Sequence, residues 1–164
     1  MQHLLTILLL LPVAGALALV LYSFVSSRSE EHYRWIALIT TVVTFAASLL
    51  LLYGAGSGAG FQFEDNVTWI GFIGARYHVA VDGISLWLVL LTTLLMPISV
   101  LSSWTAVRKR QLSYYAFLLI LESALIGVFV SLDLLLFYLF FEASLIPMFF
   151  LIGVWAASVA STRR

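Results

Sequence analysis

The stretch that decides the fold is Leu134–Val154, LLLFYLFFEASLIPMFFLIGV, an apolar run with a single acid, Glu142. A transmembrane helix needs about 20 predominantly apolar residues. A carboxylate near the bilayer centre costs about 2.5–3.5 kcal/mol even on the mildest insertion scale. Ionisable residues kept at such a depth commonly serve ion or proton pathways. We therefore predict a membrane-spanning helix in which Glu142 acts as a proton relay.

The composition of the whole chain indicates the same class of protein. Hydrophobic residues make up 63% of its 164 residues and charged residues 10%, whereas soluble domains are about 25% charged. The net charge is zero and there are no cysteines, which argues against a nucleic-acid surface, disulfides and thiolate metal sites. We predict an all-α, multi-pass transmembrane protein with about five helices. Residues 1–157 form this region, with helices near 4–25, 35–53, 84–104, 114–130 and 134–157.

One long connection separates the second and third predicted helices, at residues 54–81. It opens with a glycine-rich run, and Phe61–Ile73 then contains residues typical of extended structure. We expect a small hairpin or a surface-lying segment in this loop. Asp82 is placed to cap the third helix, and Asp133 suits the positive N-terminal end of the fifth helix.

Basic residues predict the orientation in the membrane. With five spans, one side of the bilayer receives nearly all of them and the other side receives only Arg76. By the positive-inside rule the N-terminus is then outside and the C-terminus cytoplasmic, and residues 54–81 form an outer loop. The residues on the cytoplasmic side are Arg28, Arg34, Arg108, Lys109, Arg110, Arg163 and Arg164.

A second acid, Glu122, lies in the fourth predicted helix. Glu122 and Glu142 are each ten residues from Leu132, in the short turn between the last two helices, so both should lie about 15 Å below the outer surface. Two carboxyl groups at equal depth could share a proton if their helix faces meet. Glu122 is therefore a second candidate proton relay, with a buried interhelical acid as the alternative.

Pro147 follows Glu142 by five residues. Proline has no N–H, so it cannot donate to the carbonyl of Ala143 and leaves a free acceptor beside Glu142. Water or another polar group can satisfy that carbonyl. Pro147 is accordingly a candidate site residue, and a plain packing kink is an equally good interpretation.

Several motifs resemble one known family. The segments 137–148, FYLFFEASLIPM, and 151–155, LIGVW, resemble subunit M of the proton-pumping NADH:quinone oxidoreductase, respiratory complex I. Residues 77–86, YHVAVDGISL, resemble the segment that leads into the third helix of that antiporter-like family. Sister subunits, hydrogenase subunits and Na⁺/H⁺ antiporter subunits share much of the FFE and LIP pattern.

The resemblance implies a role in proton translocation coupled to quinone reduction. Glu142 would correspond to the essential fifth-helix glutamate of the family, which pairs with a lysine on a later helix. NADH, FMN, iron–sulfur clusters and quinone would be bound by partner subunits, and this chain would hold no cofactor. Its partners would be the other membrane-arm subunits and the lipid bilayer, with no nucleic acid among them. Its location would be the bacterial plasma membrane.

The chain is truncated relative to this family and lacks its later, lysine-bearing helices. The family often continues after Val-Trp with GGKRRLYAS, and a one-base deletion would turn that peptide into AASVASTRR, which is residues 156–164 here. We interpret residues 158–164 as a cytoplasmic tail derived from such a frameshift. Two alternatives remain open: a related cation/proton antiporter or membrane hydrogenase subunit, and a five-helix structural or assembly protein without transport.

Overall fold

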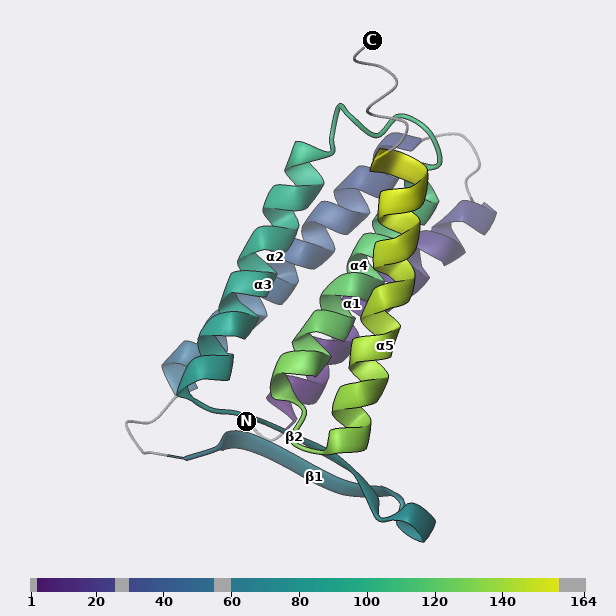
Figure 1. The fold of residues 1–164 in the computed structure, drawn as a ribbon. Coiled ribbons are helices and arrows are strands. Elements are labelled where there is room, and N and C mark those ends of the chain that lie inside the picture. Colours follow the sequence, from purple (N-terminus) through teal and green to yellow (C-terminus); the bar gives the residue numbers. More distant parts are fainter. Residues whose placement is uncertain (1–2, 26–29, 55–59, 157–164) are drawn as a thin grey trace.

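The chain forms five long helices and a two-stranded hairpin in a computed structural model that describes residues 3–25, 30–54 and 60–156 (Figure 1). Each of these five helices is long and apolar enough to cross a membrane. The prediction of an all-α, multi-pass transmembrane protein is therefore confirmed. The helices are α1 (Leu4–Val25), α2 (Glu30–Gly54), α3 (Gly83–Ser102), α4 (Gln111–Val130) and α5 (Leu134–Phe150).

Four helices differ from their expected bounds, of which α3 (Gly83–Ser102 rather than 84–104) differs by only one or two residues. Helix α2 begins at Glu30 rather than 35, and α4 begins at Gln111 rather than 114. The first turns of both helices are polar, so they were excluded when the expected bounds were drawn from apolar residues alone. Helix α5 ends at Phe150, and the chain continues as a π-helical turn, η2 (Leu151–Ala156). The tail at 158–164 lies outside the described residues, as does Arg28.

The long connection contains a β-hairpin that closes one end of the helices. Strand β1 (Gln62–Ile70) pairs antiparallel with β2 (Ala75–Val81), and the short η1 (Gly71–Ile73) joins them. Gly74 turns the chain with φ 71°, a left-handed conformation that glycine adopts readily. Leu132 N donates to His78 O over 2.8 Å, so the hairpin is attached to the turn between α4 and α5.

Two aspartates begin the helices that leave this end. The Asp82 carboxylate accepts from the backbone N–H of Ser85 over 2.7 Å and forms a capping box with it at the start of α3. The Asp133 carboxylate accepts from the backbone N–H groups of Leu135 and Leu136 at the start of α5. Backbone hydrogen bonds, that from Ser85 foremost, lower the pKa of Asp82. Both expected capping roles are present in the structure.

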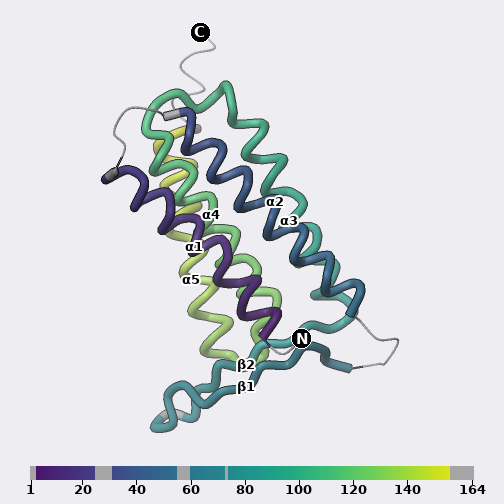
Figure 2. Tube along the Cα trace, turned by 180° about the vertical axis from the view of Figure 1, so that it is seen from behind, coloured from purple at the N-terminus to yellow at the C-terminus, as the bar shows by residue number. Residues whose placement is uncertain are grey.

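Helix α4 is the centre of the bundle. It contacts each of the other four long helices, whereas the main helical neighbour of α5 is α4. Half of the α4 span is buried inside the molecule, against 17% of the α5 span. Figure 2 shows the same arrangement from behind, with the hairpin lying across one end of the helices. One side of α5 is thus left open.

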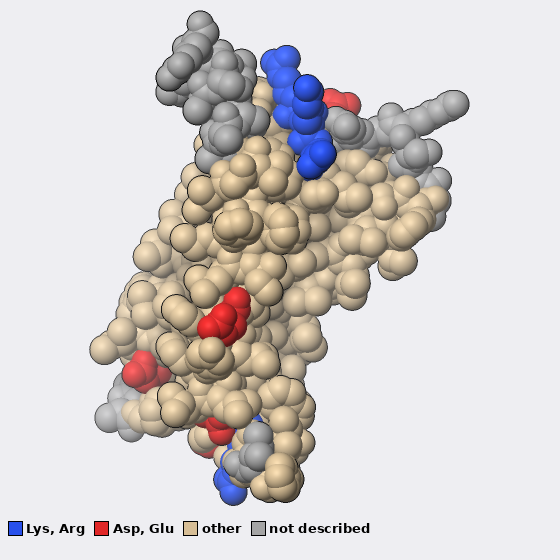
Figure 3. Space-filling model, turned by 45° about the vertical axis from the view of Figure 1, so that its right-hand side comes forward, with Lys and Arg blue, Asp and Glu red and all other residues tan. Residues whose placement is uncertain are grey.

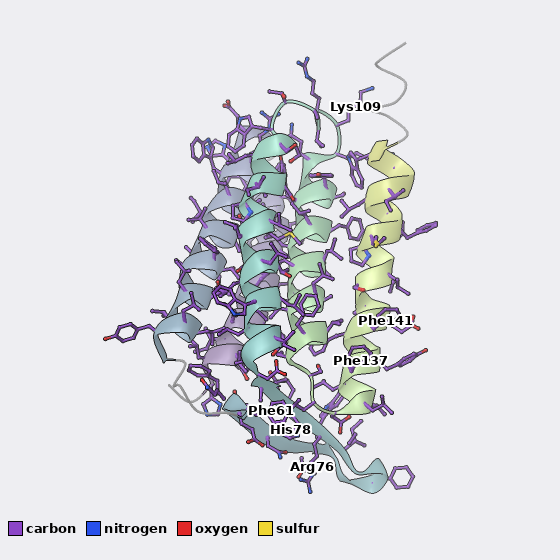
Figure 4. The ribbon with its side chains drawn as sticks, turned by 60° about the vertical axis from the view of Figure 1, so that its left-hand side comes forward. Phe61, Arg76, His78, Lys109, Phe137 and Phe141 are labelled. Atoms are coloured by element: carbon purple, nitrogen blue, oxygen red, sulfur yellow. The ribbon has the colours of Figure 1, made fainter. Side chains whose placement is uncertain are left out.

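The two ends of the bundle carry different charges. The exposed residues Arg108, Lys109 and Arg110 lie in the connection between α3 and α4, which we call the basic end. The opposite end, covered by β1 and β2, is the hairpin end. Figure 3 shows the largest group of basic side chains at one end of a mainly uncharged body, and Figure 4 shows Lys109 far from Arg76 and His78.

The interior contains two apolar clusters. The cluster at the hairpin end contains Leu5, Leu8, Leu9, Leu51, Val79, Val81, Leu86, Val89, Leu90, Ile126, Val130 and Leu136. The cluster at the basic end contains Ala16, Leu19, Tyr33, Ala37, Met96, Val100, Tyr115, Leu118 and Leu119. Burying such side chains in a close-packed core fixes how the helices are arranged.

Candidate functional site

Glu122 lies in the middle of α4, between Leu119 of one apolar cluster and Ile126 of the other. Its side chain is fully buried, and neither carboxyl oxygen has a hydrogen-bond partner among the described residues. Its neighbour Ser123 donates to the carbonyl of Leu9 in α1 over 2.7 Å. The structure therefore places Glu122 inside the bundle and not at its lipid-facing surface.

Two contacts define how α4 and α5 align. The ring of Phe140 covers Gly127, and the rings of Phe117 and Phe150 stack with centroids 5.1 Å apart. Glu122 is halfway between the two contact positions on α4, and the matching midpoint on α5 is Leu145. Glu142 precedes Leu145 by three residues, so the two acids differ in depth by about 4.5 Å.

Glu142 faces away from α4. Phe140 and Ser144, two residues before and after it, lie on the packed side of α5. A shift of two residues turns a side chain by about 200° around a helix. The Glu142 side chain is accordingly exposed, and Tyr138, one turn earlier on the same helix, lies beside it. The structure does not bring Glu122 and Glu142 together, so they do not share a proton directly.

The surroundings of Glu142 are otherwise apolar. Its neighbours Phe137 and Phe141 are exposed, and their rings stack with centroids 6.3 Å apart. Figure 4 shows these two rings along α5 at the edge of the bundle. A carboxyl group on this open side would face lipid if nothing covered it.

Pro147 is buried on the packed side of α5. Three residues later the α-helix ends, and its last turn widens into the π-helical η2. Short π-helical segments are rare and frequently occur at functional sites. Trp155, in η2, donates from its indole N–H to the carbonyl of Lys109 over 3.2 Å, which ties the end of α5 to the basic end.

Two buried polar residues of α4 were not among the sequence candidates. Gln111 is 2% exposed, and its Oε1 accepts from Arg34 Nε over 3.0 Å. Tyr115 is fully buried, and its hydroxyl has no hydrogen-bond partner in the described part of the chain. The spacing of Gln111, Tyr115 and Glu122 places all three on one side of a helix, a signal that the sequence contains.

A separate polar cluster lies where α1 meets the hairpin. Asp65 is 2.9 Å from His3 Nδ1 and accepts from the Thr6 hydroxyl over 2.8 Å. Thr6 and the Tyr77 hydroxyl are 3.0 Å apart, and burial raises the pKa of Tyr77. These residues line a cavity of about 320 Å³. The described contacts explain the cluster as an attachment of the hairpin to α1.

The fold and these acids define a class: a multi-pass α-helical membrane protein with carboxyl groups inside its spans. Comparison with known proteins shows which membrane proteins of this class the chain resembles. Residues 131–163, which include all of α5, match the family described as NADH:quinone oxidoreductase/Mrp antiporter, TM. This part of the chain is therefore similar to a family of membrane subunits.

Individual relatives extend the similarity over nearly the whole chain. NADH-quinone oxidoreductase subunit M from Rhodobacter capsulatus is 49% identical over 157 residues, covering 94% of this chain and 30% of the relative. NADH-ubiquinone oxidoreductase chain 4 from Mycosarcoma maydis is 42% identical over 162 residues, covering 97% and 33%. The corresponding chain 4 from Arabidopsis thaliana is 41% identical, covering 92% and 30%. The chain spans about a third of the length of these curated relatives.

Proposed function

We propose that this chain is part of a membrane-arm subunit of NADH:quinone oxidoreductase and contributes to a proton pathway coupled to quinone reduction. The observation that carries the proposal is Glu142, a carboxyl group in the interior of a membrane span on the open side of α5. The names of the relatives, subunit M and chain 4, favour this machine.

Glu142 needs a polar partner from outside the described helices. An exposed carboxylate in hydrocarbon costs about 2.5–3.5 kcal/mol on the mildest scale, and Tyr138 alone supplies one hydroxyl. We infer that further helices of the longer subunit cover this side of α5 and bring a cationic residue to Glu142. A carboxylate and a cation at close range stabilise each other's charged form. A change in the distance between them therefore causes one of the two groups to take up or release a proton.

The wider assembly follows from this proposal. NADH, FMN, iron–sulfur clusters and quinone bind to partner subunits, while this chain provides membrane helices. The chain lies in a bacterial plasma membrane with the hairpin end outside and the basic end in the cytoplasm, the side that attracts Arg and Lys.

A cation/proton antiporter subunit is the second candidate function, and one observation favours it. The matching family includes Mrp antiporters as well as the oxidoreductase. In that alternative the same Glu142 serves cation/proton exchange without quinone chemistry. A structural or assembly role is the third alternative, and it requires no change in proton transport when Glu142 is replaced.

The test is Glu142→Gln in membrane vesicles from cells that make the complete complex. We expect NADH-driven proton uptake, followed with a pH-sensitive dye, to fall by at least about tenfold, because a positioned proton-transfer group commonly contributes more than that. NADH oxidation by the soluble partner subunits with an artificial acceptor should stay unchanged.

Glu31→Gln is the matched control, since Glu31 is an exposed acid at the basic end, outside the interior of the spans. Its proton uptake should equal that of the unmodified protein. Unchanged proton uptake in the Glu142 variant would overturn the proposal and favour the structural role. Loss of Na⁺/H⁺ exchange without loss of NADH-driven uptake would favour the antiporter alternative.

A further inference from the structure

Two buried polar groups on α4 lack hydrogen-bond partners among the described residues. They are the Glu122 carboxyl group and the Tyr115 hydroxyl, and both side chains are fully buried. Leaving a buried donor or acceptor unsatisfied costs about 1–3 kcal/mol. Buried polar groups in native proteins are nearly always satisfied by protein or by ordered water. Two such groups in one helix therefore indicate bound molecules, such as water, that form hydrogen bonds with both.

The two groups lie on the same side of α4. Seven residues separate them, which is nearly two full turns and about 10.5 Å along the axis. Hydrogen-bonded oxygen atoms are about 2.8 Å apart, so a chain of a few water molecules matches this separation. A larger ligand does not, because Leu118 and Leu119 of the apolar cluster also fill this part of the core.

The line of polar groups continues to the basic end. Gln111 precedes Tyr115 by four residues, one turn along the same side of α4. Gln111 is bound to Arg34, whose guanidinium carbon lies 5.9 Å from the centre of the Trp104 ring. Lys109 and Arg110 are exposed to the surroundings immediately beyond. The inner side of α4 thus carries polar groups from the surface to the middle of the bundle.

Buried hydroxyl groups lie at the same level of the bundle as the inner end of this line. Each hydroxyl is buried and lies between the two apolar clusters along its own helix. Ser48 of α2 and Thr93 of α3 are hydrogen-bonded over 2.8 Å, and Pro97 cannot donate to the carbonyl of Thr93, which leaves an acceptor there. The residues of this hydroxyl layer are Thr41, Thr44, Ser48, Thr92, Thr93 and Ser123.

Along α4, the described residues toward the hairpin end form no comparable line of polar groups. Beyond Glu122, α4 continues with Ile126 and Val130, which are fully buried in the apolar cluster beneath the hairpin. Val79 and Val81 of β2 belong to the same cluster. Apolar cavities stay dry, and water enters only where several polar partners are present. Access to Glu122 is therefore expected from the basic end.

We propose that the interior of α1–α4 holds a water-binding site between Tyr115 and Glu122, through which Glu122 exchanges its proton with the basic end of the molecule. This site goes beyond the proposed function, because it requires neither Glu142 nor any partner subunit. Glu122 is the proton-holding group, Tyr115 anchors the waters, and Gln111 marks their entrance.

The experiment is infrared spectroscopy of the full chain in lipid nanodiscs during exchange from H₂O to D₂O. The carboxyl C=O band of Glu122 is the band that disappears in Glu122→Gln and persists in Glu142→Gln. We expect this band to shift to lower wavenumber in D₂O. In Tyr115→Phe the shift should be slower by about tenfold, because that variant removes one water-binding hydroxyl and nothing else.

Tyr114→Phe is the matched control, since Tyr114 is the adjacent, less deeply buried tyrosine, and its ring contacts, against Trp155 and Tyr115, are retained by phenylalanine. It should exchange at the rate of the unmodified chain, whereas Gln111→Leu should slow the exchange as Tyr115→Phe does. A Glu122 band that does not shift in D₂O would mean a dry acid and would overturn the site.

Equal rates in Tyr115→Phe and Tyr114→Phe would also overturn it. Slowing by Tyr115→Phe without slowing by Gln111→Leu would overturn the assigned entrance. Circular dichroism of each variant shows whether its helices are intact. None of these readouts depends on proton pumping, so failure here is distinguishable from failure of the role proposed for Glu142.

Discussion

At the scale of single residues, Gly127 determines how closely α4 and α5 approach each other. A Cβ atom at this position would overlap with the ring of Phe140. We predict that Gly127→Ala lowers the free energy of unfolding by about 1–3 kcal/mol, the usual effect of overpacking. Thermal unfolding in detergent micelles, followed by circular dichroism, measures this change.

Gly153→Ala is the control for this prediction. Nothing lies within 4 Å of a Cβ atom added at Gly153, so this substitution should leave the unfolding temperature nearly unchanged. If both alanine variants behaved alike, the contact between Gly127 and Phe140 would not determine the helix spacing.

The depth of the two acids was predictable from the sequence, but their direction was not. Counting residues from Leu132 placed Glu122 and Glu142 at one level, and the contacts of α4 with α5 leave an offset of about 4.5 Å. Direction depends on which side of each helix meets a neighbour. Helices that are apolar on all sides, as these are, carry no periodic pattern that identifies the packed side. Only the packing of Phe140 and Ser144 shows that Glu142 faces away.

At the scale of secondary-structure elements, Asp133 joins the hairpin to α5. Its carboxylate accepts from the backbone N–H of Arg76 over 3.1 Å and from that of Leu135 over 2.9 Å. The backbone N–H of Arg76, followed by that of Leu136, holds the pKa of Asp133 below its ordinary value of 3.8. A carboxyl group whose pKa is lowered by folding stabilises the folded state above its unfolded pKa.

We predict that this stabilisation is lost as the pH falls below 3.8 and through the lowered pKa of Asp133. Asp133→Ala should unfold at a lower temperature than the unmodified chain at pH 7. Its unfolding temperature should also fall less on acidification, because one group that binds a proton on unfolding has been removed. Thermal unfolding at a series of pH values in detergent measures both effects.

Glu31→Ala serves as the comparison for Asp133→Ala, since Glu31 is exposed at the other end of the molecule. It should retain the pH dependence of the unmodified chain. An Asp133 variant with the full pH dependence would show that the link between β2 and α5 does not contribute to the acid response.

The existence of the elements was easier to predict than their ends and contacts. Apolar length identified five spans, because the bilayer imposes a minimum length on each. The first turn of α2, which includes the polar residues Glu31 and His32, could not be assigned by that criterion. The hairpin was expected only as one of two alternatives, because residues typical of extended structure do not by themselves determine what they pair with. Its attachment to the turn at Leu132 is a long-range contact with His78.

At the scale of the whole molecule, the five helices separate two chemically different ends. The hairpin covers one end, and Arg108, Lys109 and Arg110 lie at the other. If every long helix crosses the bilayer, these two ends lie on opposite sides of the membrane. The positive-inside rule then assigns the hairpin to the outside.

Single cysteines can test this assignment cleanly, because the chain contains no cysteine of its own. Asn66→Cys places a thiol on β1, and Thr105→Cys places one in the connection at the basic end, both at exposed positions. We predict that a membrane-impermeant maleimide labels the Asn66 variant in intact cells and labels the Thr105 variant only after the cells are lysed. The reverse pattern would mean that the hairpin faces the cytoplasm. Labelling of both variants before lysis would mean that the two ends are not separated by the bilayer, and the five-span arrangement itself would then be wrong.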